Sequence, residues 1–408
     1  MHCRHCQAAL SLPLVDLGSA PPSNAYLTAD DLQKAELWYP LRVLVCEHCW
    51  LVQTADFARA DQLFDADYAY FSSYSTTWLT HAERYVDAMV ERFGLSAASR
   101  VVEVAANDGY LLQFVQRRGI PCTGVEPTAS TAAAARARGI PIVQDFFGER
   151  LAEQLLAEDG PVDLMVANNV LAHVPDINDF VRGFRRLLKP RGVATFEFPH
   201  LLRLISDTQF DTIYHEHFSY LSLTAGERIF RSCGLQVFDV VELPTHGGSL
   251  RVFTQRLDTG AHPLAASVTR LLDLEHRASL DSPAGYAGFQ AKTDLIKDSF
   301  LEFLLSARRQ GRKVAAYGAA AKGNTLLNYA GVRRDLVPYV VDRNPAKLGK
   351  YLPGSRIPIV AEGRIRDERP AAILVLPWNL RSEVMDQLAY AREWGSRFVT
   401  FVPELRVS

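Results

Sequence analysis

A run of four titratable residues, Tyr214-His215-Glu216-His217, lies in the middle of the 408-residue chain. Tyrosine and histidine side chains can remove a proton from a substrate, and a neighbouring carboxylate can orient the histidine. If the run is extended, Tyr214 and Glu216 share one face and the histidines share the other, whereas a turn groups them differently. So many titratable groups in one short segment favour acid–base chemistry over a purely structural role.

Two CxxC pairs, Cys3-Arg-His-Cys6 and Cys46-Glu-His-Cys49, place four thiols in two tight turns. Two such turns can complete a tetrahedral shell of four thiolates around Zn²⁺. In a reducing compartment this spacing favours a metal over a pair of redox-active dithiols, which is the alternative interpretation. Four thiolates leave no open coordination position for chemistry, so we expect the zinc ion to be structural.

The segment from Val101 to Leu112 has the pattern of a strand, a turn of small residues and the start of a helix. Such a loop lets the backbone approach a cofactor closely. The pattern is not GxGxxG, and an acidic residue in the strand would repel a pyrophosphate but attract a cationic sulfonium amino acid. The loop therefore favours S-adenosylmethionine over a nicotinamide dinucleotide. The residues that we assign to this cofactor are Glu103, Ala105, Asn107 and Gly109.

Acidic and amide side chains follow the next strands of the same pattern. An acidic residue after the second strand can accept hydrogen bonds from both ribose hydroxyls. An acidic residue after the third strand can accept a hydrogen bond from the adenine amino group. Ligands of such folds bind at the edge where the strands end. The cofactor-binding set therefore continues with Glu126, Pro127, Asp145, Asn168 and Asn169.

The elements that must position these residues follow a β/α rhythm, which predicts a doubly wound parallel sheet. Its expected strands are Val101–Val104, Cys122–Val125, Leu164–Ala167 and Val193–Phe198, and its expected helices include Thr77–Phe93, Tyr110–Arg118, Thr128–Arg138 and Asp179–Leu188. An aromatic and histidine-rich insertion at 199–222 interrupts the rhythm. It is followed by an expected helix, Thr224–Ser232, and two strands, Leu235–Leu243 and Ser249–Gln255.

A second β/α rhythm begins at Lys313, after a charged helical connector. Its expected strands include Val337–Val341, Ala372–Leu376 and Phe398–Val402. We therefore expect the α/β fold class in three units: an N-terminal zinc-binding module at 1–75, a central Rossmann-like domain for S-adenosylmethionine at 76–262, and a connector helix with a second Rossmann-like α/β domain at 263–408.

The composition limits the classes of binding partner. The formal net charge of −2 creates no field that would gather nucleic acid or an anionic membrane surface. No run approaches the ~20 apolar residues that cross a bilayer, and the first residues lack the apolar core of a secretory signal. We expect a cytoplasmic, monomeric enzyme with no nucleic-acid or membrane partner.

Two glycine-containing loops and one aromatic stretch are candidates for substrate binding. The loop at 246–251 offers side chains for hydroxyls or phosphate, although a plain hairpin turn has the same pattern. The loop at 318–325 suits a diphosphate, unless it is only a tight β-to-α turn. The aromatic stretch at 68–78 lines the substrate or packs as core. The residues that we assign to substrate binding are His246, Ser249, Arg251, Lys322, Asn324, Tyr70 and Tyr74.

Taken together, the motifs resemble those of the C-methyltransferases that build branched deoxysugars, a class I group dependent on S-adenosylmethionine. The motifs are the double CxxC, Tyr70-Phe-Ser-Ser-Tyr74-Ser, Glu103-Val-Ala-Ala-Asn-Asp-Gly109, Asn168-Asn-Val-Leu-Ala-His173-Val-Pro, Tyr214-His-Glu-His217-Phe-Ser-Tyr-Leu-Ser222, His246-Gly-Gly-Ser-Leu-Arg251 and Gly318-Ala-Ala-Ala-Lys322-Gly-Asn324. The last three are specific to that group, and the similarity spans nearly the whole chain.

The resemblance implies a reaction class and a set of catalytic residues. Members of the group methylate C3 of a nucleotide-diphosphate 4-keto-6-deoxysugar, here linked to dTDP or GDP, and the catalytic residues by this match are Tyr214, Glu216, His217 and His173. Removing a proton beside a ketone moves charge onto the carbonyl oxygen, which needs a hydrogen-bond donor. Our hypothesis makes His217 or Tyr214 the base, Glu216 the residue that orients His217, and His173 the donor to the enolate.

Three other functions are compatible with parts of the sequence. A sugar O- or N-methyltransferase would use the histidines to deprotonate a hydroxyl or an amine. An RNA methyltransferase with a zinc ribbon would need a basic stripe, against which the near-neutral charge argues. A non-enzymatic scaffold with two relic nucleotide folds would not need the titratable run. The identity of the nucleotide and sugar, the C3 substituent and the stereochemistry are not encoded in these motifs.

Overall fold

The computed structural model describes residues 1–55 and 71–408, so Tyr70 lies outside the described residues. The N-terminal residues form a small antiparallel sheet in the order β1-β2-β3-β9. Its strands are β1 (Leu12–Ala20), β2 (Tyr39–Val45), β3 (Val52–Thr54) and β9 (Ser219–Tyr220). The last strand comes from the insertion at 199–222, so this sheet joins the N-terminal residues directly to the segment that follows His217.

The central domain contains a seven-stranded sheet in the order β10-β11-β8-β7-β4-β5-β6. Its strands are β4 (Val101–Val104), β5 (Cys122–Val125), β6 (Ile142–Val143), β7 (Val162–Asn168), β8 (Leu188–Pro199), β10 (Leu235–Leu243) and β11 (Ser249–Arg256). β8, β7, β4, β5 and β6 are parallel, and β11 lies antiparallel between β8 and β10. β4 is buried along its whole length, as expected of a strand covered on both faces.

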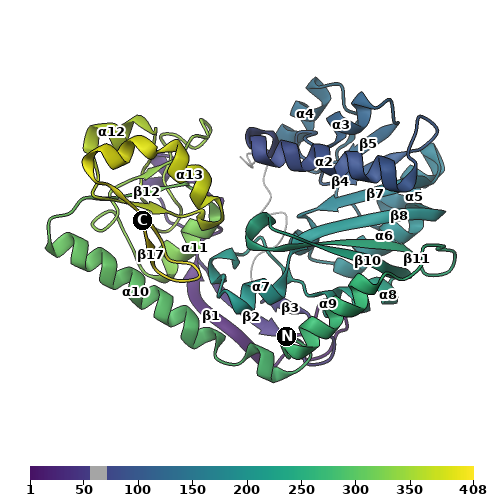
Figure 1. The fold of residues 1–408 in the computed structure, drawn as a ribbon, viewed down its shortest axis with the longest axis horizontal. Coiled ribbons are helices and arrows are strands. Elements are labelled where there is room, and N and C mark those ends of the chain that lie inside the picture. The colour runs from purple at the N-terminus through teal and green to yellow at the C-terminus, as the bar shows by residue number, and fades with distance from the viewer. Residues whose placement is uncertain (56–70) are drawn as a thin grey trace.

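Helices cover both faces of the central sheet (Figure 1). One face packs against α2 (Thr76–Phe93), α3 (Leu112–Arg117) and α4 (Ala129–Ala137), and the other packs against α5 (Glu149–Asp159), α6 (Ile177–Leu187) and α8 (Leu223–Ser232). Alternate residues of β4 face the two sides, because Val101 belongs to the first core and Val102 to the second. The domain is thus a three-layer α/β structure, as the sequence predicted.

The C-terminal domain contains a six-stranded sheet in the order β14-β13-β12-β15-β16-β17. Its strands are β12 (Val314–Tyr317), β13 (Val340–Val341), β14 (Ile359–Val360), β15 (Ala372–Val375), β16 (Arg397–Thr400) and β17 (Arg406–Val407), and its helices are α11 (Ala321–Tyr329), α12 (Gly363–Glu368) and α13 (Arg381–Gln387). All neighbouring strands are parallel except β16 and β17. This is a second doubly wound sheet, with its topological switch point between β12 and β15.

Two helices and the N-terminal sheet connect the two large domains (Figure 1). α9 (Ala266–Arg277) packs on β10 and α8, and α10 (Phe289–Arg309) packs on β1 and on the C-terminal sheet. The N-terminal sheet shares a hydrophobic core with the C-terminal domain, whereas its cysteine turns pack into the core of the central domain. The N-terminal module therefore contacts both domains. Among the described residues, no helix is long and apolar enough to cross a membrane.

Candidate functional site

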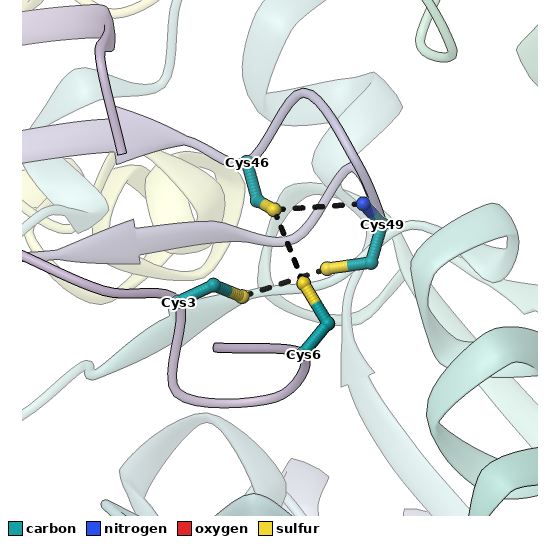
Figure 2. Close-up of side chains that lie close together, drawn as sticks. All are labelled: Cys3, Cys6, Cys46 and Cys49. Carbon is teal, nitrogen blue, oxygen red and sulfur yellow. Dashed lines mark hydrogen bonds between the residues drawn. The ribbon is translucent and has the colours of Figure 1, made fainter. Parts of the chain in front are cut away.

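The four cysteines of the two CxxC turns converge on one point (Figure 2). Their sulfur atoms all lie within 4.8 Å of one another, and the pairs Cys3–Cys49 and Cys6–Cys46 are each 3.5 Å apart. A tetrahedral shell with Zn–S bonds of about 2.3 Å has sulfur–sulfur edges of about 3.8 Å. The donor set and its spacing thus fit a structural Zn²⁺ ion held by Cys3, Cys6, Cys46 and Cys49.

Both cysteine turns have the same backbone geometry. Gln7 and Trp50, the residues after the second cysteine of each pair, have φ angles of 61° and 63°. Their amides donate to the carbonyls of Cys3 and Cys46, at 3.0 and 2.8 Å. The left-handed conformation is unfavourable for residues other than glycine, so the surrounding structure must hold both turns in place.

The turn after β4 forms the expected cofactor loop. Ala105 and Asn107 have φ angles of 58° and 50°, in the region that glycine adopts freely. Glu126, after β5, accepts hydrogen bonds from the Asn107 amide at 2.9 Å and from Thr128. Its carboxylate is thereby fixed at the end of the second strand, next to Pro127, where ribose hydroxyls bind in such folds.

Three side chains at this edge of the sheet carry buried polar atoms that lack a hydrogen-bond partner among the described residues. They are both carboxylate oxygens of Glu103, both amide atoms of Asn168, and Oδ1 of Asn169. Burial, partly offset by the nearby Tyr110, raises the pKa of Glu103 well above its usual range. Buried polar groups normally find partners, and a ligand with cationic amino and sulfonium groups supplies them. These residues fit S-adenosylmethionine.

Residues 72 and 73 form hydrogen bonds with this cofactor loop. The Ser72 amide donates to Asn107 Oδ1 at 2.9 Å, and the Ser73 hydroxyl donates to Asp108. Tyr74 remains exposed, with its ring against Phe71. Asp145, after β6, is partly exposed and forms an ion pair with Arg150.

Residues 214–217 form a turn, in which the His217 amide donates to the Tyr214 carbonyl at 2.9 Å. The turn brings the two side chains together, with Tyr214 Oη 2.8 Å from His217 Nε2. His217 Nδ1 lies 2.8 Å from the Thr212 carbonyl, which can only accept, so Nδ1 carries the proton. Burial, together with the neighbouring His173, lowers the pKa of His217 well below its usual range, so the ring is neutral and Nε2 accepts from Tyr214.

Glu216 does not orient His217, contrary to our hypothesis. Both nitrogens of the His217 ring are engaged with other groups, and Glu216 instead accepts hydrogen bonds from the Asn24 amide and side chain at 3.1 Å. The side chain is fully buried, and this burial raises the pKa of Glu216. Through these hydrogen bonds Glu216 connects the turn to the N-terminal module.

His173 lies beside His217, with ring centroids 4.6 Å apart. Its Nδ1 is 2.7 Å from the Glu216 carbonyl, so Nδ1 carries the proton. Burial lowers the pKa of His173 to about 4, which keeps the ring neutral and leaves Nε2 with a lone pair. A neutral ring in this tautomer carries its proton on Nδ1, so this arrangement does not support the donor role that we expected for His173.

The N-terminal module holds this turn through several hydrogen bonds. The Thr54 hydroxyl donates to the His217 carbonyl at 2.5 Å, and the Thr54 amide donates to the Phe218 carbonyl at 3.1 Å. His215 Nε2 lies 3.3 Å from the Tyr39 carbonyl. A cysteine turn also contacts the first turn of α6, where His5 Nδ1 is 2.7 Å from Asn178 Oδ1.

The loop at 245–248 packs against the C-terminal domain in a strained conformation. His246, Gly247 and Gly248 have φ angles of 55°, 90° and 115°. A Cβ atom on Gly247 would lie 2.4 Å from the Trp378 ring, so only glycine permits this contact. His246 Nε2 lies 3.2 Å from Asn169 Nδ2, which brings the loop to the carboxyl end of β7.

Three residues that we assigned to substrate are engaged inside the protein. Arg251 is buried and forms a 2.8 Å ion pair with Glu197, so its charge is not available for phosphate. Ser249 is buried and donates to the Thr245 carbonyl at 2.9 Å. Asn324 is fully buried and donates to the Ser23 carbonyl at 2.6 Å.

Lys322, by contrast, reaches the group of histidines from the C-terminal domain. Its ammonium lies 4.6 Å from the centre of the Trp378 ring and 3.2 Å from Asn379 Oδ1. Burial lowers the pKa of Lys322, and its charge in turn lowers the pKa of both His217 and His246. Lys322 follows β12 and Trp378 follows β15, so both lie at the switch point of the C-terminal sheet.

The first amide of the C-terminal β-to-α loop is already occupied by the protein. The Ala319 amide donates to Asp342 Oδ2 at 2.8 Å, and its carbonyl accepts from Tyr26 and from Lys347, each at 2.7 Å. The Asp342 carboxylate therefore occupies a backbone N–H group that a diphosphate would use in a dinucleotide-binding loop.

Three residues near the candidate site were not identified from the sequence: His81, Glu197 and Asp211. His81 Nε2 is 2.9 Å from Glu197 Oε1, and its ring stacks on Trp78, which in turn contacts His246. A carboxylate between two buried phenylalanines of β8, Phe196 and Phe198, needs a buried partner, and that signal would have pointed to Glu197. Asp211 accepts a hydrogen bond from the Trp378 indole at 2.7 Å.

The comparisons with known proteins agree with this three-part organisation. The matching family models are described as "Putative zinc binding domain" (residues 3–64), "Methyltransferase domain" (78–240) and "C-methyltransferase C-terminal domain" (244–403). C-methyltransferase NovU of Streptomyces niveus is 34% identical over 405 residues, which cover 99% of this chain and 96% of that protein. A ubiquinone biosynthesis O-methyltransferase of Sodalis glossinidius is 29% identical over 27% of this chain and 45% of its own length.

One solved structure with partial similarity is the magnesium protoporphyrin IX methyltransferase of Synechocystis with bound SAH. It is 15% identical and covers 44% of this chain and 83% of its own, with a TM-score of 0.35.

Proposed function

The chain belongs to the family of S-adenosylmethionine-dependent C-methyltransferases, and from this premise we propose that it methylates C3 of a nucleotide-diphosphate 4-keto-6-deoxysugar through an enolate. The substrate class is supported by the motifs at 214–222, 246–251 and 318–324, which are those of the branched-sugar enzymes. A carbon beside a ketone is acidified enough for a protein base to remove its proton, and C3, next to the C4 ketone, is such a carbon.

The observation that carries the proposal is the hydrogen-bonded pair of Tyr214 and His217. His217 Nδ1–H donates to the Thr212 carbonyl, which fixes the tautomer and aims the Nε2 lone pair at the Tyr214 hydroxyl. A neutral tyrosine is a weak base by itself. In this pair it can take a proton from carbon while its own proton passes to His217 Nε2.

The surrounding groups suit the next step of this reaction. S-adenosylmethionine, when bound, supplies an electrophilic methyl group. His173, beside His217, is neutral, and its lowered pKa leaves a second acceptor rather than a competing cation. Tyr214, His173, His246 and Lys322 all retain partly exposed surface. These four side chains would face the substrate.

The proposal is tested with Tyr214→Phe and His217→Ala, using S-adenosylmethionine and a panel of nucleotide 4-keto-6-deoxysugars. Each variant loses one half of the proton pathway, so we expect kcat to fall at least about 10²-fold, within the range for general acid–base catalysis. The affinity for S-adenosylmethionine, measured by calorimetry, should change little because neither side chain belongs to the cofactor loop.

His276→Ala provides the control, because His276 is exposed and pairs only with Asp281 on the surface. Near-normal turnover in both active-site variants would place the base elsewhere. Loss of S-adenosylmethionine binding in either variant would mean that the turn acts on the cofactor rather than on the substrate.

A further inference from the structure

The enolate oxygen needs a hydrogen-bond donor, and the two central histidines do not provide one. His173 and His217 are neutral, and each uses its single N–H on a backbone carbonyl. The Tyr214 hydroxyl donates its hydrogen bond to His217 Nε2. His246 accepts from Asn169 through Nε2 and retains one neutral N–H at Nδ1. A neutral donor stabilises a full negative charge less than an ammonium group does.

Lys322 is the cation that the structure brings to this group of residues. It lies in the first turn of α11, and its ammonium has one amide oxygen, Asn379 Oδ1, at 3.2 Å. The face of Trp378 supports the ammonium from 4.6 Å without supplying a counter-ion. An ammonium group has three donors, so at least one remains available for a ligand.

The packing of α11 places this lysine next to the catalytic turn. The Thr325 hydroxyl donates to the Ile213 carbonyl, one residue before Tyr214, at 2.8 Å. Trp378, below the ammonium, donates to Asp211 at 2.7 Å. The second oxygen of Asp211 is buried and has no hydrogen-bond partner among the described residues. The helix, the tryptophan and the turn are therefore fixed to one another.

We propose that Lys322 is a catalytic residue whose ammonium group binds the C4 oxygen of the keto-sugar and stabilises the enolate. The inference rests on the proposed function. The C3–H bond breaks, its proton goes to Tyr214 as the tyrosine proton passes to His217, and the electron pair moves onto the C4 oxygen beside Lys322. When the new bond from C3 to the methyl carbon forms, the C4 carbonyl is restored and the methyl–sulfur bond breaks.

This assignment differs from the sequence expectation that Lys322 holds the diphosphate. A diphosphate ligand would contribute equally to substrate and transition-state binding, so its loss would raise KM. An enolate donor acts only as charge develops, so its loss lowers kcat.

The experiment measures the exchange of the C3 proton with deuterium oxide by NMR, with keto-sugar nucleotide and no methyl donor. Wild-type enzyme should exchange the proton, because enolate formation does not need the methyl group. Lys322→Met should slow both this exchange and kcat by about 10²–10³-fold, as for the loss of an oxyanion donor, with KM changed less than about threefold. Lys322→Gln, a polar neutral variant, serves if Lys322→Met does not fold, and should show the same pattern.

Lys297→Met is the matched control, because Lys297 is also a cation over an aromatic ring, 4.6 Å from the centre of Tyr329. It should exchange and turn over like wild type. A raised KM with unchanged kcat in the Lys322 variants would assign Lys322 to the diphosphate, and unchanged exchange would also overturn the proposal. If wild type neither exchanges nor methylates any sugar of the panel, the proposed function itself fails.

Discussion

The tautomers of His173 and His217 are determined by hydrogen bonds to backbone carbonyls. His173 and His217 each direct Nδ1–H at a carbonyl oxygen, so each presents a lone pair at Nε2. Burial keeps both neutral by lowering the pKa of each ring. In the proposed mechanism these residues are proton acceptors, and the positive charge comes from the C-terminal domain through Lys322.

The pH dependence of turnover follows from the state of His217. Its pKa lies well below the ordinary value of about 6.5, so the ring stays neutral as the pH falls through 6.5 and protonates only at lower pH. We expect kcat to hold its plateau below pH 6.5 and to fall in more acidic solution. The measurement is a kcat–pH profile in a constant-ionic-strength buffer.

The kcat–pH profile of the Lys322→Met variant tests the same account in a second way. The Lys322 charge contributes to the low pKa of His217, so its removal should shift the acid limb toward higher pH. An acid limb at or above pH 6.5 in the wild-type enzyme would show that a different group must be deprotonated.

The turn at 214–217 is held by elements that are distant in sequence. β3 pairs with β9, and Thr54 and Asn24 bind the backbone and side chains of the turn. The N-terminal sheet is therefore part of the active-site framework, and the exact position of His217 depends on it.

Replacing Thr54 with valine tests this dependence. The change removes the hydroxyl that donates to the His217 carbonyl while keeping the shape of the side chain. A lost hydrogen bond contributes about 1 kcal/mol, so we expect kcat to fall by about fivefold while the affinity for S-adenosylmethionine is unchanged. Thr54→Ser retains the hydroxyl and should keep wild-type kcat. Equal losses in both variants would attribute the effect to packing instead.

Several strands of the central sheet were predicted from the sequence, whereas the N-terminal strands β1, β2 and β3 and the turn in the insertion were not. The strands Val101–Val104, Cys122–Val125 and Leu235–Leu243 have the predicted bounds, because their β-branched runs end at turn residues. The turn at 214–217 is decided by contacts with Thr54 and Asn24, which local pattern does not encode. For the same reason the sequence did not predict that Arg251 pairs with Glu197 or that Asn324 donates to the Ser23 carbonyl.

The whole molecule places the switch points of two doubly wound sheets around one group of side chains. The central sheet contributes Glu103 and Asn168 for the methyl donor, and the C-terminal sheet contributes Lys322 and Trp378. The N-terminal module packs against both domains through two separate cores. Its four cysteines hold the N-terminal residues against the first turn of α6, where His5 contacts Asn178.

Removal of zinc should therefore affect turnover more than donor binding. We expect one Zn²⁺ per chain by elemental analysis, since the four sulfurs form one cluster. Zinc binding supplies about 10–16 kcal/mol to small folded elements, so chelation should lower the melting temperature and abolish methyl transfer. S-adenosylmethionine should still bind, because Glu103, Asn107 and Glu126 lie in the central domain. Full activity after complete removal of zinc would contradict this role.

The most direct measurement is carbon NMR of the product formed from a nucleotide 4-keto-6-deoxysugar and S-adenosylmethionine with a ¹³C-labelled methyl group. We predict a methyl signal coupled to a sugar ring carbon at C3, which becomes quaternary when C3 already carries a substituent. A labelled methyl on oxygen or nitrogen would contradict the enolate mechanism and would assign the Tyr214–His217 pair to deprotonation of a hydroxyl or an amine.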